Sequence, residues 1–458
     1  MRFFHFPLLI VCGIASIGTQ MAQAGKLELK PQLPIAADDN HAAAKETLEQ
    51  RNERMKWWRD AKFGLFIHYG LYSGLAGEWK GKPGGSEWIQ KNVEVDTKSY
   101  REEALPLFNP APKAVEKWVQ LAKDVGCQYA VLTTKHHDGF CLFDNPHTDY
   151  DTKDHFNRDL VGEFAQACKK VGLKLGFYHS VIDWQHPDYD HTICPDLCYP
   201  KGQIEYLQKQ NIPRNHQAYQ TYLHSSIKEL MSKYGTVDIL WWDYSQGDME
   251  GKKGWEAHKL IEMIKDINPQ IIMNNRLYSY SGLNQEQSGS LDLRCGDFIT
   301  PEKFIPAEGY PSDWESCITT SDKWGYNRYD TKVKSSEELV GKLVECITKG
   351  GNLLLNINPK ADGSIPEAVE QSIRGLGKWV NTHKEAIFNT RAYLGLSLPA
   401  TQNEQGDIFI FCDQDSLFHL PQDKSKALRL DTKEPLKINN GTLQITPQKG
   451  QILVIKLS

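Results

Sequence analysis

A short apolar segment that ends in a carboxylate carries the clearest chemical signal in the sequence. Residues 237–240 are mostly apolar, and they are followed by Trp241, Trp242 and Asp243. This pattern predicts a strand buried on both faces, with aromatic rings and one acid at its carboxyl end. A lone Asp at such a position often caps the next helix or turn. The two indole rings beside Asp243 favour a ligand pocket instead, because pockets combine aromatic walls with a few polar groups.

Polar side chains also follow the other strands that we expect. In a parallel α/β fold the carboxyl ends of the strands meet at one face, so these side chains should converge. The strand-end and loop residues concerned are His68, Tyr69, Glu87, Trp88, Lys135, His136, His137, Asp138, Tyr178, His179, Trp241, Asp243, Asn275 and Arg276. Such groups suit a polyhydroxylated ligand, since they bond hydroxyl groups while indole faces cover C–H surface. Taken singly, each histidine could equally be a core residue.

No nucleotide-binding motif accompanies these residues. The sequence has neither a GxxxxGK[ST] loop nor a strand-linked GxGxxG. A net charge of −5 also argues against a nucleic-acid partner.

Hydrolysis of a glycosidic bond would need a second carboxyl group near Asp243. The segment GDFITPEKFIP (296–306) supplies Glu302 in a loop that could reach the pocket. Pro301-Glu302 could equally be the first turn of a helix. Glu308 and Glu315 are therefore rival candidates for the second acid.

Strands and helices alternate over most of the chain. Strands are expected at 63–70, 129–134, 173–180, 237–243, 271–276, 291–298, 314–319 and 352–358. Helices are expected at 46–56, 115–125, 160–171, 219–234, 255–266 and 336–349, with a further helix that ends near His383. This alternation of eight strand candidates with helices favours a (β/α)8 barrel over a doubly wound sheet.

The two ends of the chain differ from this middle part. After residue 385 short strands alternate with turns, among them Asn439-Asn440-Gly441, which is typical of a hairpin. We expect a barrel at 25–385 and an antiparallel β-sandwich domain at 386–458.

The apolar run at 3–17 and the A-x-A pattern that ends at Ala24 predict a signal peptide at 1–24. The run is shorter than the roughly 20 apolar residues of a membrane span, so we expect an exported protein, periplasmic or extracellular.

Nine cysteines remain after cleavage at Ala24. An odd number spread over a long chain predicts mainly buried thiols rather than a disulfide framework. Cys194 and Cys198 lie in a Pro-containing loop and could pair with each other or bind a metal.

Several segments together resemble glycoside hydrolase family 29, the α-L-fucosidases. The segments are WWRDAKFGLFIHYG, SEWIQ, TTKHHDGF, GFYHS, IDWQHPDY, VDILWWD, NNR, GDFITPE, SDKWGYN and GNLLLNINPKADGSIP. The resemblance extends from about residue 46 to 380. It implies an exo-acting retaining enzyme that removes terminal α-L-fucosyl groups from fucosylated oligosaccharides or glycoconjugates.

The resemblance also assigns residue roles. It implies that Asp243 is the nucleophile that forms a covalent fucosyl-enzyme, and that Glu302 is the acid/base. Trp324 would close one side of the pocket. The residues that would contact fucose are His68, Glu87, Trp88, His136, His137, Tyr178, Trp241 and Arg276.

Three other interpretations remain open at this stage. A metal-dependent barrel hydrolase could use His68, His136, His137 and Asp138 as zinc ligands. However, adjacent histidines on a strand point to opposite faces, and a His-x-His spacing is missing here. We therefore expect no metal and no other cofactor. A non-catalytic sugar-binding relative would not need both Asp243 and Glu302. An α-L-galactosidase would act on the same ring stereochemistry with an added hydroxyl at C6.

Overall fold

The computed structural model describes residues 46–193, 199–211, 213–244, 254–277 and 296–458. The predicted signal peptide and Cys194, Cys198 and Cys295 lie outside these residues. None of the helices described combines the length and the apolar character that a membrane crossing requires. The six described cysteines are free and buried, as predicted, and they are Cys127, Cys141, Cys168, Cys317, Cys346 and Cys412.

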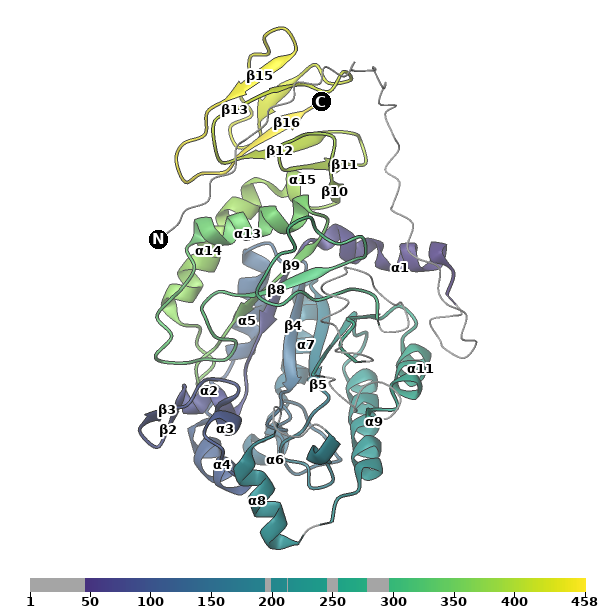
Figure 1. The fold of residues 1–458 in the computed structure, drawn as a ribbon, viewed down its shortest axis with the longest axis vertical. Coiled ribbons are helices and arrows are strands. Elements are labelled where there is room, and N and C mark those ends of the chain that lie inside the picture. Colours follow the sequence, from purple (N-terminus) through teal and green to yellow (C-terminus); the bar gives the residue numbers. More distant parts are fainter. Residues whose placement is uncertain (1–45, 194–198, 212, 245–253, 278–295) are drawn as a thin grey trace, which may run out of the picture. The chain divides into compact units, whose positions relative to one another are not determined.

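Seven parallel strands form most of a barrel wall, part of which is labelled in Figure 1. They are hydrogen-bonded in the order β7-β6-β5-β4-β1-β9-β8. The strands are β1 (Phe63–Ile67), β4 (Tyr129–Lys135), β5 (Lys174–Ser180), β6 (Ile239–Asp243), β7 (Ile272–Met273), β8 (Glu315–Thr319) and β9 (Asn352–Ile357).

Residues 298–299 close the ring between β7 and β8. Phe298 forms a parallel bridge with Asn274, and Ile299 forms one with Trp314. The predicted (β/α)8 barrel is therefore confirmed. The sixth strand of the barrel was expected at 291–298. In the part that the structure describes, its pairing consists only of these bridges.

Helices surround the barrel or lie in the loops that follow its strands. Local sequence explains several of their ends: Asp159 caps α7 by accepting from the Gly162 N–H, and Gly172 ends that helix in the left-handed conformation. The longer helices are α1 (Leu48–Ala61), α5 (Ala114–Asp124), α7 (Leu160–Val171), α8 (Lys201–Gln210), α9 (His216–Lys233), α11 (Ala257–Ile267), α13 (Ser336–Thr348) and α14 (Glu367–Thr382). The shorter ones are α2 (Leu71–Leu75), α3 (Ile89–Asn92), α4 (Thr97–Ala104), α6 (Thr152–Phe156) and α15 (Lys384–Ile387).

The interior of the barrel is filled by side chains. Met55, Trp58 and Ala61 of α1 belong to the same buried cluster as inward-facing residues of the strands. The strand and bridge residues of this cluster are Phe66, Tyr129, Val131, Tyr178, Ile239, Trp241, Ile272, Phe298, Cys317 and Leu354. Since Asn352, the first residue of β9, donates to the Trp58 carbonyl, α1 covers the amino-terminal ends of the strands. A ligand site is left to the opposite end.

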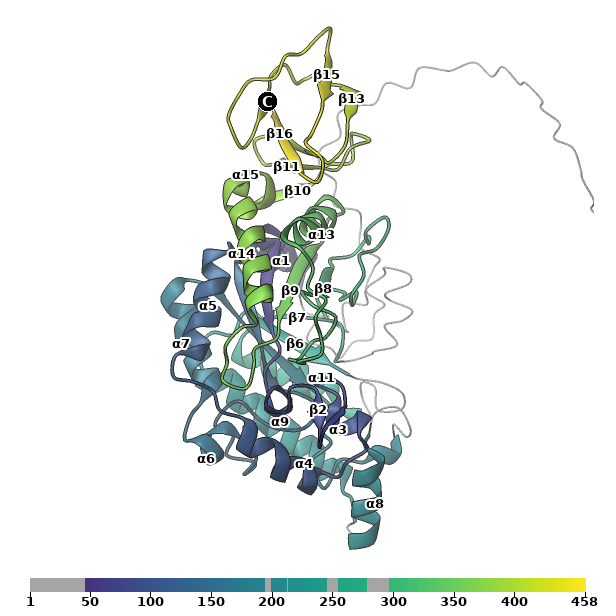
Figure 2. The same ribbon diagram turned by 90° about the vertical axis from the view of Figure 1, so that its left-hand side faces the viewer.

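Residues after α15 form two antiparallel sheets (Figure 2). The larger sheet contains β10 (Thr390–Ala392), β11 (Ala400–Asn403), β12 (Ile408–Cys412), β16 (Leu453–Leu457) and β14 (Ala427–Arg429), and the smaller pairs β13 (Ser416–His419) with β15 (Thr442–Ile445). Both contribute to one apolar core, as expected for the predicted sandwich. Asn440 and Gly441 have φ angles of +49° and +73° between the bridged Asn439 and Thr442, which fits the predicted hairpin turn. The domain boundary at 385/386 stays a prediction.

Candidate active site

A cavity of about 310 Å³ lies at the carboxyl ends of the barrel strands. Its lining consists of Phe66, His68, Glu87, Trp88, His136, His137, Tyr178, Trp241, Asp243, Tyr244, Arg276, Glu302 and Trp324. The structure thus brings together all ten residues that were predicted to be catalytic or substrate-binding, and Trp324 with them. Phe66 and Tyr244 were not predicted.

Asp243, the last residue of β6, is held by one donor on each oxygen. Arg276 Nη1 lies 2.9 Å from Oδ1, and the Tyr178 hydroxyl donates to Oδ2 over 2.8 Å. His137 Nε2 lies 3.8 Å from Oδ2. Because both oxygens are bonded to charged or strongly polar donors, the orientation of this carboxylate is fixed.

Glu302 shares a guanidinium nitrogen with Asp243. Its Oε2 lies 3.1 Å from Arg276 Nη1, and its Oε1 accepts from Trp324 Nε1 over 3.0 Å. Since Asp243 Oδ1 lies 2.9 Å from the same nitrogen, the two carboxylate oxygens cannot be farther apart than the sum of these distances, 6.0 Å. Glu302 forms a backbone bridge with Cys317, so it does not begin a helix as its Pro-Glu sequence allowed.

Arg276 is itself fixed on three sides. Its Nε donates to Thr300 Oγ1 over 2.8 Å and its Nη2 to the Thr300 carbonyl over 3.0 Å. The guanidinium carbon lies 4.7 Å from the centre of the Trp241 ring, which adds a cation–π contact. The position of the guanidinium is therefore set by Thr300 and Trp241, and the guanidinium in turn fixes the two acids relative to each other.

The two rival acids are elsewhere. Glu308 is exposed and does not line the cavity. Glu315 is buried inside the barrel, where it accepts from Trp241 Nε1 over 3.2 Å and from the Tyr129 hydroxyl. Burial raises the pKa of Glu315 to about 7. Glu315 thus supports Trp241 from within the barrel and does not face a ligand.

Three buried histidines face the cavity as neutral rings. Burial lowers the pKa of His68 to about 3 and lowers the pKa values of His136 and His137 well below the ordinary 6.5. Neutral imidazoles can bond sugar hydroxyls without adding charge next to Asp243.

The expectation that His136 and His137 point to opposite faces was wrong, because their ring centres are 4.0 Å apart. Strand β4 ends at Lys135, so both histidines lie beyond the part of the chain in which side chains alternate. Among the described residues, no cluster of three or more His, Cys, Asp or Glu is arranged to hold a metal ion.

Five strand-end residues that we expected at the same face do not line the cavity. They are Tyr69, Lys135, Asp138, His179 and Asn275. Lys135 is paired with buried Asp183 over 3.1 Å. Asp138 accepts from the Tyr100 hydroxyl over 2.9 Å. These side chains hold the loops in place and leave the cavity to their neighbours.

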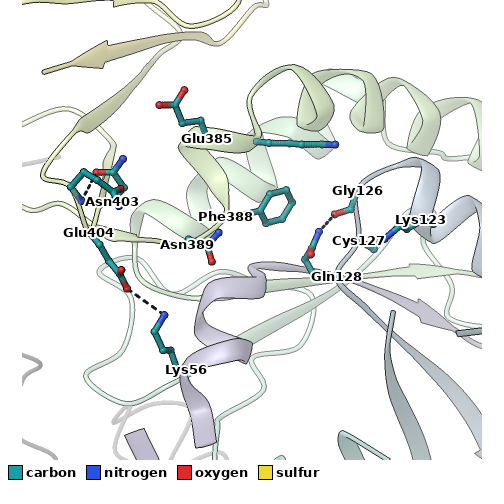
Figure 3. Close-up of a pocket in the computed structure, with 12 residues that line it drawn as sticks. Lys56, Lys123, Gly126, Cys127, Gln128, Glu385, Phe388, Asn389, Asn403 and Glu404 are labelled. Carbon is teal, nitrogen blue, oxygen red and sulfur yellow. Dashed lines mark hydrogen bonds and ion pairs between the residues drawn. The ribbon is translucent and has the colours of Figure 1, made fainter. Parts of the chain in front are cut away.

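A larger cleft of about 690 Å³ lies beside the amino-terminal end of β4, between α1 and the turn before β12 (Figure 3). Its charges are largely satisfied within the protein: Lys56 bonds Asp60 over 2.7 Å and Glu404 over 3.3 Å. Glu385 is bonded to Lys456. The residues that line this cleft include no histidine, and its two glutamates, Glu385 and Glu404, are each bonded to a lysine. It therefore does not compete with the cavity at the strand ends.

The two carboxyl groups bonded to Arg276 give this barrel the pair of acids that glycoside hydrolases use. Residues 32–385 match the α-L-fucosidase family. The chain belongs to this family, glycoside hydrolase family 29, and is therefore a glycoside hydrolase.

Individual relatives agree with this family. The plasma α-L-fucosidase of Rattus norvegicus is 29% identical over 74% of this chain and 71% of its own length. The tissue α-L-fucosidase of Homo sapiens is 30% identical over 74% and 70%.

Solved structures are similar over more of the chain. α-L-Fucosidase isoenzyme 1 from Paenibacillus thiaminolyticus has a TM-score of 0.79 and 32% identity, covering 89% of this chain and 99% of its own. A family 29 enzyme from Bacteroides thetaiotaomicron, solved as a trapped covalent intermediate, has a TM-score of 0.74 and 26% identity, covering 89% and 96%.

Proposed function

We propose that this protein is an exo-acting retaining α-L-fucosidase in which Asp243 is the nucleophile and Glu302 the acid/base. The shared Arg276 nitrogen carries this proposal, because it limits the separation of the two carboxylate oxygens to 6.0 Å. Retaining glycosidases hold their carboxyl groups about 5–5.5 Å apart, whereas inverting enzymes need about 6.5–9.5 Å to admit a water molecule.

The two steps follow from this placement. Asp243 attacks the anomeric carbon while the bond to the leaving oxygen breaks, and Glu302 gives that oxygen its proton. A covalent glycosyl-enzyme results. Glu302, now ionised, takes a proton from water; the water oxygen attacks the anomeric carbon and the Asp243 carboxylate leaves.

The size of the cavity supports removal of one terminal sugar. About 310 Å³ lies at the small end of the range for ligand pockets, a size that suits one monosaccharide unit. His68, His136, His137 and Glu87 supply polar contacts, and Trp88, Trp241 and Trp324 supply aromatic surface. Fucosylated oligosaccharides or glycoconjugates are the substrates that this arrangement and the family favour.

A panel of terminal fucosides tests the activity. The wild-type protein should release fucose from an aryl α-L-fucoside and from at least one fucosylated oligosaccharide, and NMR of the first product should show the α anomer. Asp243→Ala is the control and should be inactive. A β product would contradict the retaining mechanism, and cleavage of an aryl α-L-galactoside in preference to the fucoside would favour the galactosidase alternative.

We also propose that the chain is exported to the periplasm or the extracellular space. The support is the sequence of residues 1–24, with its apolar run and its A-x-A pattern. Amino-terminal sequencing of the protein recovered from its native cells tests this proposal. A mature protein that begins at Gly25 is expected, and an intact amino terminus in the cytoplasmic fraction would contradict export.

A further inference from the structure

Asn356 connects a backbone carbonyl to a histidine of the cavity. Its Nδ2 lies 2.8 Å from the Trp324 carbonyl oxygen, and its Oδ1 lies 2.6 Å from His68 Nδ1. Asn356 is fully buried on β9, and His68 is only 4% exposed. The side chain is thus fixed at both ends between the loop that carries Trp324 and the ring of His68.

These contacts determine where the protons lie. A carbonyl oxygen can only accept, so the amide nitrogen of Asn356 must face Trp324 and its amide oxygen must face His68. That oxygen also can only accept, so Nδ1 of His68 carries a hydrogen. Burial lowers the pKa of His68 to about 3, and a neutral imidazole has a single N–H. Nε2 of His68 therefore presents a lone pair.

We propose that Asn356 is a positioning residue that holds His68 in its Nδ1–H tautomer, so that Nε2 accepts a hydrogen bond from a hydroxyl of the sugar. This inference rests on the proposed function and extends it, because it states the direction of one recognition contact. The sugar position that faces His68 must carry a hydrogen-bond donor. A fluorine or a methoxy group there would place a second acceptor against the Nε2 lone pair.

Substitutions of Asn356 should change the tautomer in different ways. In Asn356→Leu the buried Nδ1–H has no acceptor, which favours transfer of the hydrogen to Nε2 and reverses the polarity that the sugar meets. In Asn356→Asp a carboxylate of the same shape faces the ring and favours the doubly protonated imidazolium. Both variants therefore lose the acceptor at Nε2, Asn356→Leu through a change of tautomer in a neutral ring and Asn356→Asp through protonation of the ring.

Asn358 provides a matched control on the same chain segment. It is also buried, and its Nδ2 donates to Ser321 Oγ over 3.0 Å. It thus bonds Ser321, three residues before Trp324 in the same loop, and no hydrogen bond joins it to a cavity histidine among the described residues. Asn358→Leu removes a comparable contact to this loop without touching the His68 proton.

NMR of the full-length protein labelled with ¹⁵N in histidine tests the inference directly. The His68 signals are assigned by their loss in His68→Gln. In the wild-type protein Nε2 should have the shift of an unprotonated nitrogen and Nδ1 that of a protonated one, unchanged from mildly acidic to neutral pH. A protonated Nε2 in the wild-type protein would overturn the inference whether or not the variants fold.

Kinetics with aryl fucosides give an independent readout. Asn356→Leu and Asn356→Asp should each lower kcat/KM by about tenfold or more, as the loss of one hydrogen bond in the complex implies. Asn358→Leu should stay within about threefold of wild type. In a series of analogues with one sugar hydroxyl replaced by fluorine, the analogue fluorinated at the position that faces His68 should be penalised more in wild type than in Asn356→Leu, because fluorine can only accept and the Nε2–H of the variant can donate to it. An equal penalty in both would contradict the role of Asn356.

The two proposals fail in different ways. If the wild-type protein cleaves no fucoside, the proposed function fails while the NMR assignment of His68 can still stand. If the wild-type enzyme is active and Nε2 of His68 is protonated, only the inference about Asn356 fails.

Discussion

Replacing Tyr178 by Phe removes one hydrogen bond to the proposed nucleophile and little else. The lost contact is the 2.8 Å bond from the Tyr178 hydroxyl to Asp243 Oδ2. The ring can keep its stacked contacts with Trp241 and His136, at centroid distances of 5.8 and 5.6 Å. Arg276 still bonds Oδ1. Tyr178→Phe therefore tests what this hydrogen bond contributes to the reaction of Asp243.

The size of the effect follows from the kind of bond. A hydrogen bond to a charged group contributes about 1.5–3 kcal/mol, and about 1.4 kcal/mol corresponds to a tenfold change in rate. Asp243 loses negative charge as it attacks, so the bond is weaker in the transition state than in the free enzyme. Only part of its energy is therefore lost from the transition state, and we expect kcat/KM to fall by less than about tenfold.

The assay is kcat/KM for an aryl α-L-fucoside across the pH range of activity. Tyr150→Phe is a suitable control, because it removes a buried hydroxyl that has no hydrogen-bond partner among the described residues and that does not line the cavity. Its kcat/KM should match that of wild type. A fall in kcat/KM of more than about tenfold in Tyr178→Phe would refute this reasoning.

Three further predictions concern the acid, the stability and the absence of a metal. Glu302→Ala should slow substrates with poor leaving groups far more than activated aryl fucosides, and azide should partly restore activity; equal losses on both substrates would point to another acid. Buried His179 has a pKa well below 6.5, so the unfolded chain binds more protons and the free energy of unfolding should fall as pH drops below about 6.5, by up to about 1.4 kcal/mol per unit for this residue. His179→Phe should make that slope shallower in urea titrations at several pH values, and an unchanged slope would contradict the assignment. Activity should survive a chelator, whereas a loss that added zinc or calcium restores would favour a metal-dependent mechanism.

Regular elements were predictable where the pattern of apolar residues is strong. The strands at 129–134 and 352–358 were placed to within about a residue, since each is a continuous buried run. Helix α9 begins at His216, earlier than the predicted 219, because the Asn215 side chain caps it by accepting from the Ala218 N–H. The sixth strand was expected at 291–298, but its described part pairs only through bridges at 298–299.

The residues of the cavity were harder to predict from residue type alone. Phe66 lies two residues before His68, so strand alternation places both side chains on the inner face and could have identified it. Tyr244 follows Asp243 with a φ of +71°; this left-handed conformation breaks the alternation and brings the ring against Trp88 and His137. No periodic pattern could have indicated that turn.

Residue type alone is also misleading for Glu315. It has the residue type of an acid catalyst, but it is the first residue of β8. It therefore lies near the amino-terminal end of its strand, away from the mouth. Position along the strand, rather than residue type, separates it from Glu302.

Covalent trapping tests the central claim most directly. The Glu302→Gln variant would be treated with 2-fluoro-fucosyl fluoride, digested and analysed by mass spectrometry, with Asp243→Ala in the same background as the control. The account predicts one fluorofucosyl group on the side chain of Asp243 and none in the control. A label on any other residue, or a label that persists in the Asp243→Ala control, would contradict the assignment of Asp243 as the nucleophile.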